Sequence, residues 1–211
     1  MIKLNKSDKP QILVQNEIQW NQDYVAYVNG QISDVQAGNR HRHSQIREAV
    51  NSEAHGKCIY CEEKILSSQF GDVDHICPKS IYPQFYATWT NLGLSCSKCN
   101  NAKRDKDGFI DPFSEDPSIH LYFLGPMVNY YHGSIKGSLT VRGIKLNRGA
   151  LLEKRTKALE ALIDKIELMQ ASPEPLRAVI HEEILVDVSD EAEFAGTLRA
   201  YYTNVANDFE D

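Results

Sequence analysis

The sequence predicts an α+β protein in which a small, metal-braced core is wrapped by helical extensions at both ends. Two Cys-x-x-Cys pairs, Cys58/Cys61 and Cys96/Cys99, are separated by 34 residues and suit one tetrahedral zinc site. Between the pairs, Val73-Asp74-His75-Ile76 is typical of a short strand, and apolar residues recur at helical spacing on both sides of the core. With 211 residues and 42% hydrophobic content, the chain is long enough for this arrangement.

The N-terminal lead-in, residues 1–56, is predicted to be helical. One helix is expected over residues 11–28, starting after Pro10 and ending at Asn29-Gly30. A second helix is expected over residues 39–54, with Gly56 as its stop. Its outward face would carry three arginines, Arg40, Arg42 and Arg47.

The predicted zinc-braced core spans residues 57–110. It would contain a knuckle at residues 58–61, a strand at residues 73–76 and a helix that opens around residues 97–100. The segment 111–147 is expected to form a β-hairpin-like linker. Its two strands are predicted at residues 119–131 and 138–146, across a Gly-rich turn at residues 133–137.

The C-terminal region, residues 148–211, is predicted to be helical with an acidic tail. Helices are expected near 148–170, 174–186 and 190–206, the last opened by an Asp190-x-x-Glu193 cap. The formal net charge is −6, but residues 172–211 alone carry ten acids and two Arg, a net of −8, which leaves +2 on the rest. The tail is either a solvated helical face, a docking surface for a basic partner or a restraint on substrate access.

The cysteine count favours zinc over disulfides. Cys77 is left over from the two pairs, and an odd count argues against a secreted disulfide framework, although disulfides within the pairs remain the alternative. No apolar run is long enough for a signal peptide or a membrane span. We therefore expect a cytoplasmic protein.

Residues between and beside the cysteine pairs could hydrolyse a phosphodiester. A neutral imidazole at His75 is a competent general base, and Asp74 offers a hard carboxylate for Mg²⁺ or Mn²⁺. Asn100 adds a neutral oxygen ligand, and Asn91 could tie the intervening loop to the backbone and orient the imidazole. Because neighbouring strand residues face opposite ways, Asp74 and His75 can share a site only at a bend or at the strand end.

These residues resemble the HNH endonuclease superfamily, whose ββα-metal fold carries Asp-His on a strand, a middle Asn, and a final His or Asn on the helix. The resemblance covers about residues 58–103. It implies His75 as general base, Asp74 and Asn100 as ligands of the catalytic divalent ion, and Asn91 as the orienting residue. It also implies that the four paired cysteines bind structural zinc and that Lys103 approaches a phosphate.

The segment that follows Asp-His is aromatic where many HNH members have a Gly pair. Its Tyr82-Pro83 and Trp89-x-Asn91-Leu92 elements, with helices on both sides of the core, look like the nuclease subunit of Septu-type and retron-linked anti-phage defence systems. That resemblance implies an ABC-type ATPase partner. The leading hypothesis is a metal-dependent HNH endonuclease that cleaves double-stranded DNA, and the family resemblance implies a 5′-phosphate and a 3′-hydroxyl as the product ends.

Basic residues cluster in sequence near the core and could form a phosphate track, with Arg40, Arg42 and Arg47 adjacent in space. The cluster consists of Lys79, Lys98, Lys103, Arg104 and Lys106. Nearby acids could instead neutralise it as an ordinary mixed surface. Two alternative functions stay open: an RNA-cleaving HNH nuclease, and a non-catalytic zinc module that recruits nucleic acid or a protein partner.

Overall fold

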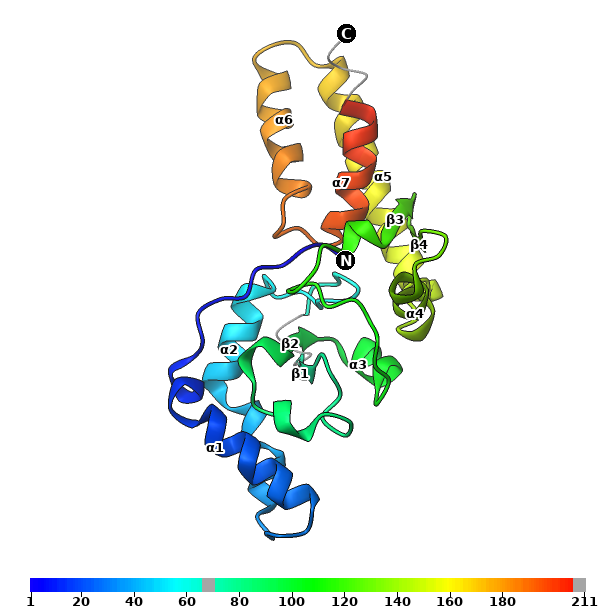
Figure 1. The fold of residues 1–211 in the computed structure, drawn as a ribbon. Coiled ribbons are helices and arrows are strands. Elements are labelled where there is room, and N and C mark those ends of the chain that lie inside the picture. Colours follow the sequence, from blue (N-terminus) through cyan, green and yellow to red (C-terminus); the bar gives the residue numbers. More distant parts are fainter. Residues whose placement is uncertain (66–70, 207–211) are drawn as a thin grey trace.

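A two-stranded antiparallel sheet and the helix that follows it form the centre of the molecule (Figure 1). The structure is a computed structural model that describes residues 1–65 and 71–206. Strand β1 (Asp72–His75) pairs with β2 (Leu92–Ser95), with His75 opposite Leu92, and α3 (Ser97–Lys103) follows directly. The chain is therefore α+β with a ββα core, as the sequence predicted.

The N-terminal helices pack on one side of this core (Figure 1). Helix α1 (Gln11–Val28) has the predicted bounds. The second predicted helix is divided: a 3-10 turn (Arg40–Arg42) precedes α2 (Ser44–Glu53). His43 makes the break, because its extended backbone carries a side chain that accepts a hydrogen bond from the Gln45 N–H and so caps α2.

The linker contains one hairpin, but not the one predicted. Strand β3 (Leu121–Leu124) pairs with β4 (Met127–Tyr130) across Gly125-Pro126, and Gly125 has the positive φ of 53° that such a turn needs. The strand predicted over residues 138–146 is wrong, since helix α4 (Ile135–Gly143) occupies that segment. The Gly-rich segment starts this helix: Ser134 caps it by accepting from the Gly137 N–H.

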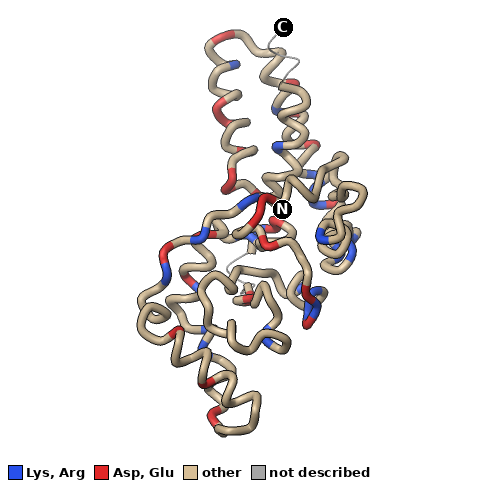
Figure 2. Tube along the Cα trace, viewed as in Figure 1, with Lys and Arg blue, Asp and Glu red and all other residues tan. Residues whose placement is uncertain are grey.

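Three helices stand at one end of the molecule, away from the sheet (Figure 1). They are α5 (Gly149–Ala171), α6 (Leu176–Asp187) and α7 (Ala195–Ala206). The predicted cap at Asp190 is wrong, because α7 begins five residues later, after Phe194 with its positive φ. Residues 207–211, the end of the predicted acidic tail, lie outside the described residues. Acidic positions recur along α6 (Figure 2).

Two apolar clusters stabilise the fold, and α5 takes part in both. The larger joins the N-terminal helices, the sheet and the hairpin, and it includes Leu151 at the start of α5. The smaller joins the rest of α5 with α6 and α7. None of the helices in the described parts of the chain is long and apolar enough to cross a membrane. The four-part division proposed from the sequence stays a prediction.

Candidate active site and metal centre

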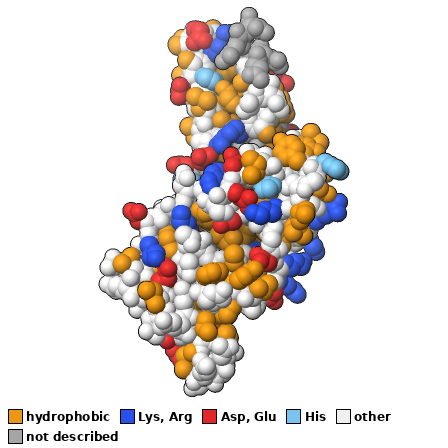
Figure 3. Space-filling model, in the orientation of Figure 1, with side chains coloured by type: hydrophobic (Ala, Val, Ile, Leu, Met, Phe, Trp, Pro, Cys, Tyr) orange, Lys and Arg blue, Asp and Glu red, His pale blue; other side chains and the backbone are white. Residues whose placement is uncertain are grey.

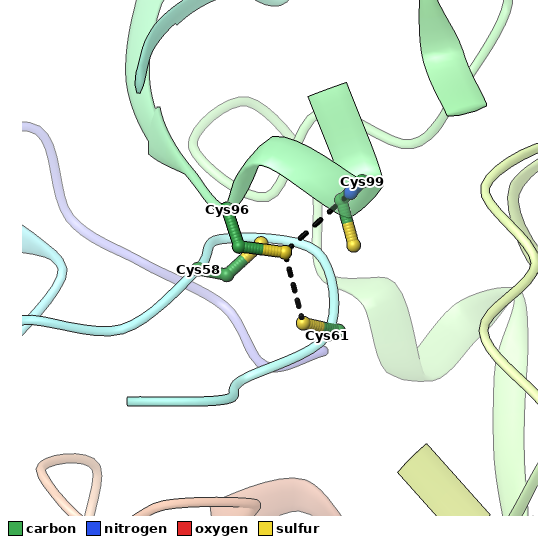
Figure 4. A group of neighbouring side chains, drawn as sticks. All are labelled: Cys58, Cys61, Cys96 and Cys99. Carbon is green, nitrogen blue, oxygen red and sulfur yellow. Dashed lines mark hydrogen bonds between the residues drawn. The ribbon is translucent and has the colours of Figure 1, made fainter. Parts of the chain in front are cut away.

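The four paired cysteines meet in space although they come from two distant segments (Figure 4). Cys58 and Cys61 lie on the knuckle, while Cys96 and Cys99 lie at the start of α3. Their four sulfur atoms all lie within 4.8 Å of one another, and the Sγ atoms of Cys61 and Cys96 are 3.8 Å apart. Zn–S bonds of about 2.3 Å in a tetrahedron place sulfurs about 3.8 Å apart. The cluster can therefore hold zinc, and all five cysteines are free thiols rather than disulfides.

The knuckle is fixed to the sheet by its backbone. The Ile59 N–H donates to the Leu94 carbonyl of β2 at 2.9 Å, and the Cys58 N–H donates to the Glu63 carbonyl at 3.0 Å. At the other half of the cluster, the Cys96 sulfur accepts from the Cys99 N–H at 3.5 Å and so caps α3. A metal ion between the two halves would tie the knuckle to the helix that carries Asn100.

Arg148 lies beside the sulfur cluster, a contact that no signal in the sequence indicated. Its guanidinium nitrogens lie 3.5 Å from the Cys99 sulfur and 3.7 Å from the Cys61 sulfur. Burial alone would lower the pKa of Arg148, yet these two sulfurs raise the pKa above its ordinary value. A zinc ion with four thiolates carries a formal charge of −2, so the guanidinium offsets part of that charge.

A pocket of about 370 Å³ runs along β1 and brings three of the four predicted catalytic residues together, without Asn91. Asp74 and His75 are successive residues of β1, and both line this pocket together with Asp72 and Val73. The other lining residues come from the N-terminal segment, the loop after β1, and α3 with the residues that follow it. They are His41, Arg42, Arg47, Gly71, Asp72, Val73, Pro78, Lys79, Asn100, Lys103, Arg104 and Asp105.

His75 is buried at 6% exposure and held by one backbone contact. Its Nε2 lies 2.8 Å from the Tyr86 carbonyl oxygen, which can only accept, so Nε2 carries the ring proton and Nδ1 keeps its lone pair. Burial, followed by the charge of Lys79, lowers the pKa of His75 to about 3. The imidazole is therefore neutral near pH 7. A substrate phosphate beside it would raise this pKa and strengthen the base.

Asp74 is not free in the pocket but paired. Its Oδ2 accepts from the Tyr60 hydroxyl at 2.7 Å, and its Oδ1 lies 3.3 Å from the Lys103 ammonium. Burial raises the pKa of Asp74, while Lys103 and Tyr60 oppose that change. Lys103 also donates to the His75 carbonyl at 2.5 Å.

Lys103, which the HNH resemblance places near a phosphate, is buried. It lines the pocket but is only 1% exposed. A buried ammonium needs an opposite charge and acceptors, and Asp74 with the His75 carbonyl supplies both.

Asn100 meets a carboxylate that sequence reasoning did not select. Its Nδ2 donates to Asp72 Oδ2 at 3.0 Å, which leaves the Asn100 Oδ1 and the second Asp72 oxygen as further acceptors. Asp72 lies two residues before Asp74 and thus on the same face of β1. The period of two along the strand was the signal that could have identified it.

Asn91 fastens the loop between the strands. Its Oδ1 accepts from the Cys77 N–H at 2.7 Å, and its Nδ2 donates to the carbonyls of Cys77 and Phe85, both at 3.1 Å. The loop then continues to Tyr86, whose carbonyl holds His75. Asn91 therefore reaches the imidazole only indirectly, through the loop.

The predicted phosphate track is only partly assembled around the pocket. Lys79 and Arg104 line it, together with Arg42 and Arg47 from the N-terminal segment, whereas Lys98 does not. Arg40 lies away from the pocket and pairs with Asp23 and Asp34. Lys and Arg side chains also gather along one side of the molecule (Figure 3).

The pocket also has the donor chemistry for a hard divalent ion. Asp72, Asp74 and Asn100 line it, and carboxylate and carboxamide oxygens of the kind they carry suit Mg²⁺ or Mn²⁺. The Asp74 oxygens already accept hydrogen bonds, so an ion there would compete with Lys103 for that carboxylate. The residues fit such an ion, with Asp72 as an addition to the predicted pair.

Comparison with known proteins agrees with this geometry. Residues 58–106 match the family model described as HNH endonuclease. The chain is 26% identical over 225 residues to "Septu protein PtuB" of Bacillus thuringiensis, an alignment that covers 97% of this chain and 82% of that protein. A second "Septu protein PtuB", from Bacillus mycoides (strain KBAB4), is 24% identical over 165 residues, which covers 61% of this chain and 56% of the relative. The resemblance to HNH endonucleases and to this relative is thereby confirmed.

Proposed function

We propose that this chain, which carries an HNH endonuclease segment at residues 58–106 and resembles Septu protein PtuB along nearly its whole length, is a metal-dependent endonuclease of an anti-phage defence complex. It would hydrolyse phosphodiester bonds of double-stranded DNA. One observation carries the proposal: a buried, neutral imidazole, whose Nε2 is held by the Tyr86 carbonyl, lines a pocket together with Asp72, Asp74, Asn100 and several basic side chains.

His75 is the residue that moves the proton. Its Nδ1 would accept a proton from the attacking water, while the Tyr86 carbonyl holds the ring through Nε2. Lys79, Arg42 and Arg47 attract the phosphate and balance its charge. The products would be a 5′-phosphate and a 3′-hydroxyl.

Asp74 and Asn100, with Asp72 beside them, would hold the divalent ion. Bound Mg²⁺ or Mn²⁺ supplies Lewis-acid stabilisation of the charge that develops on the phosphoryl oxygens. Asn91 supports the loop rather than the reacting atoms. Zinc at the four cysteines would be purely structural, since all four positions of a tetrahedron are filled by sulfur.

The proposed partner and compartment are supported by the similar proteins and by the free cysteines. Similarity to Septu protein PtuB supports a defence role beside an ABC-type ATPase subunit, and five reduced cysteines suit the cytoplasm. Copurification with the product of a neighbouring ATPase gene would test the partner. The partner would also supply affinity for nucleic acid, which a chain of net charge −6 lacks.

The enzymatic proposal is tested by cleavage of duplex DNA and of structured RNA by the zinc-loaded chain, with EDTA, Mg²⁺ or Mn²⁺. We expect DNA cleavage only with the divalent ions, and a loss of about 10²–10⁴-fold in His75→Ala. His132→Ala is the matched control, because His132 is exposed and far from the pocket in sequence. His75→Ala that retains zinc and cleaves like the parent would refute the assignment, and cleavage of RNA alone would replace the substrate.

A further inference from the structure

A second imidazole, that of His41, lies in the same pocket as His75 although it belongs to the N-terminal segment. The side chain is buried at 4% exposure, and the two rings are 4.8 Å apart between centroids, tilted by 57°. His41 lies outside the HNH segment of residues 58–106. A buried histidine beside a phosphate-binding pocket is either a packing residue or a polar group that the substrate uses.

Tyr86 determines which edge of the His41 ring faces the pocket. The Tyr86 hydroxyl accepts from the His41 backbone N–H at 3.2 Å and lies 3.0 Å from His41 Nδ1. The hydroxyl accepts from the backbone N–H and has one proton to donate; when it donates that proton to Nδ1, the ring proton of His41 is on Nε2. With Nδ1 engaged by Tyr86, the Nε2–H edge is the one left for the pocket.

The charges around His41 keep this donor neutral. Burial lowers the pKa of His41 to about 2, and the neighbouring His75, Lys79, Arg42 and Arg47 act in the same direction. A neutral N–H suits a phosphoryl oxygen, because it adds a hydrogen bond where several cations already balance the charge. Purely apolar packing would not require a ring whose Nδ1 is held by a hydroxyl and whose other edge lies in a polar pocket.

Tyr86 thus contacts both imidazoles, each through a different oxygen atom. Its carbonyl accepts from His75 Nε2 and turns Nδ1 of that ring toward water, while its hydroxyl turns Nε2 of His41 toward the pocket. Stacking on Tyr24 of α1, with ring centroids 4.0 Å apart, fixes the position of Tyr86. One proton acceptor and one proton donor therefore face the pocket side by side.

We propose that His41 is a further catalytic residue, whose Nε2–H donates to a nonbridging oxygen of the scissile phosphate. The inference rests on the proposed nuclease function and extends its site beyond the HNH segment into the N-terminal lead-in. A donor that meets charge as it develops on the phosphoryl group stabilises the transition state more than the bound substrate. Its removal then lowers kcat more than it raises KM.

The first test measures kcat and KM on duplex DNA for His41→Phe and His41→Gln, with His132→Phe as the control. His41→Phe keeps a ring but no donor, and we expect kcat to fall about 10²-fold. His41→Gln keeps an N–H near the position of Nε2, and we expect it to stay within about tenfold of the parent. Zinc content and the unfolding midpoint are measured for each variant, so that a folding defect is recognised.

The second test separates contact with the phosphate from a mere positioning role. Sulfur accepts hydrogen bonds poorly, so duplexes with an Rp or an Sp phosphorothioate at the mapped cleavage position report on each nonbridging oxygen. In Mn²⁺, the parent should cleave one diastereomer more slowly, and His41→Phe should lose most of that difference. Tyr86→Phe keeps the carbonyl for His75 but lacks the hydroxyl, and it should lose part of the rate difference between diastereomers. This second variant keeps the test decisive if His41→Phe does not fold.

The outcomes are distinct. The inference is overturned if folded His41→Phe cleaves within about twofold of the parent. It is also overturned if the rate ratio between diastereomers is unchanged in both His41→Phe and Tyr86→Phe. In either case the proposed function stands if His75→Ala is inactive. A parent chain that cleaves no nucleic acid with any divalent ion overturns the proposed function itself, and the inference with it.

Discussion

One backbone carbonyl decides which nitrogen of His75 can accept a proton. Because the Tyr86 oxygen accepts from Nε2, the lone pair is at Nδ1, and burial among cations keeps the ring uncharged. A histidine in water would be partly protonated at slightly acidic pH. At the scale of the residue, the site therefore consists of a base fixed in one tautomer and one charge state.

The two buried imidazoles make the stability of the fold sensitive to acid. Their pKa values, about 2 for His41 and about 3 for His75, lie below the ordinary value of 6.5. Below pH 6.5 both histidines bind protons in the unfolded chain but not in the folded chain. The free energy of unfolding is therefore greatest above pH 6.5 and falls as the pH decreases. Each imidazole should remove about 1 kcal/mol between pH 6.5 and 5.5. Urea unfolding at both pH values should show a loss about 1 kcal/mol smaller in His41→Phe than in the parent, and equal losses would contradict the assignment of a neutral His41.

The buried pair of Lys103 and Asp74 gives a second prediction at this scale. Lys103→Met leaves the Asp74 carboxylate and the His75 carbonyl without their ammonium partner, and we expect the free energy of unfolding to fall by about 3 kcal/mol. Lys98→Met on the exposed face of the same helix should change it by less than about 0.5 kcal/mol. Denaturant unfolding measures both variants. Equal stability of the two variants would mean that Lys103 points into solvent.

At the scale of elements, the loop between β1 and β2 is the part that brings Tyr86 to the site. Asn91 fastens its start and its middle, Ser80 and Tyr82 donate to Asp105 and Asp107, and Tyr86 stacks on α1. The loop is therefore held from three directions. Its aromatic composition serves packing on the N-terminal helices and positions the carbonyl that holds His75.

Asn91→Ala should release this loop without disturbing the sheet. Three hydrogen bonds to backbone groups are lost, at about 1 kcal/mol each. We expect the amides of Ile81, Tyr82 and Phe85 to exchange with deuterium at least about tenfold faster, and cleavage to fall while zinc stays bound. Asn101→Ala, an exposed position on α3, is the control. Unchanged exchange in the loop would show that Asn91 does not support it.

Local patterns predicted the elements whose residues interact with near neighbours. The bounds of α1 follow from Pro10 and Asn29-Gly30, and the cysteine spacing identified the cluster and the strand between its halves. The strand expected over residues 138–146 is wrong because the Gly-rich segment at residues 133–137 was taken as a hairpin turn, whereas Ser134 in it caps a helix. Gly125-Pro126 was the better turn signal.

Contacts between distant segments could not be predicted in this way. His41 and His75 are both held by Tyr86, which lies 45 residues after His41 in the sequence. Arg148, at the N-terminus of α5, contacts the sulfur of Cys99. Neither contact leaves a spacing in the sequence. The burial of Lys103 likewise depends on Asp74, which lies 29 residues away in sequence and pairs with it in the core.

At the scale of the whole molecule, Arg155 of α5 links the C-terminal helices to the core. Its buried guanidinium donates to the carbonyls of Leu146 at 2.8 Å and of Cys61 at 3.4 Å, and it lies over the Phe194 ring. The knuckle that holds two sulfurs therefore contacts α5 directly. Loss of zinc from the cysteines would therefore be expected to disturb both the core and the C-terminal helices.

Removal of zinc should unfold the core. Structural zinc contributes about 10–16 kcal/mol of apparent binding free energy in zinc-finger peptides, which exceeds or equals the stability of most domains. We expect a strong chelator, or Cys58→Ser, to shift the emission of buried Trp89 to longer wavelength. Cys77→Ser should retain zinc and native emission, since Cys77 lies outside the cluster. Native emission from metal-free protein would exclude a structural role for the site.

The central claim is that one pocket along β1 brings a neutral imidazole and a divalent ion together in a core that zinc stabilises. Anomalous diffraction from crystals of the chain grown with Mn²⁺, recorded at the zinc and manganese edges, tests it directly. We predict a zinc peak among the four paired sulfurs and a manganese peak at Asp74 and Asn100, with His75 Nδ1 facing it. A manganese peak elsewhere, or His75 turned away with its Nε2 separated from Tyr86, would contradict the account.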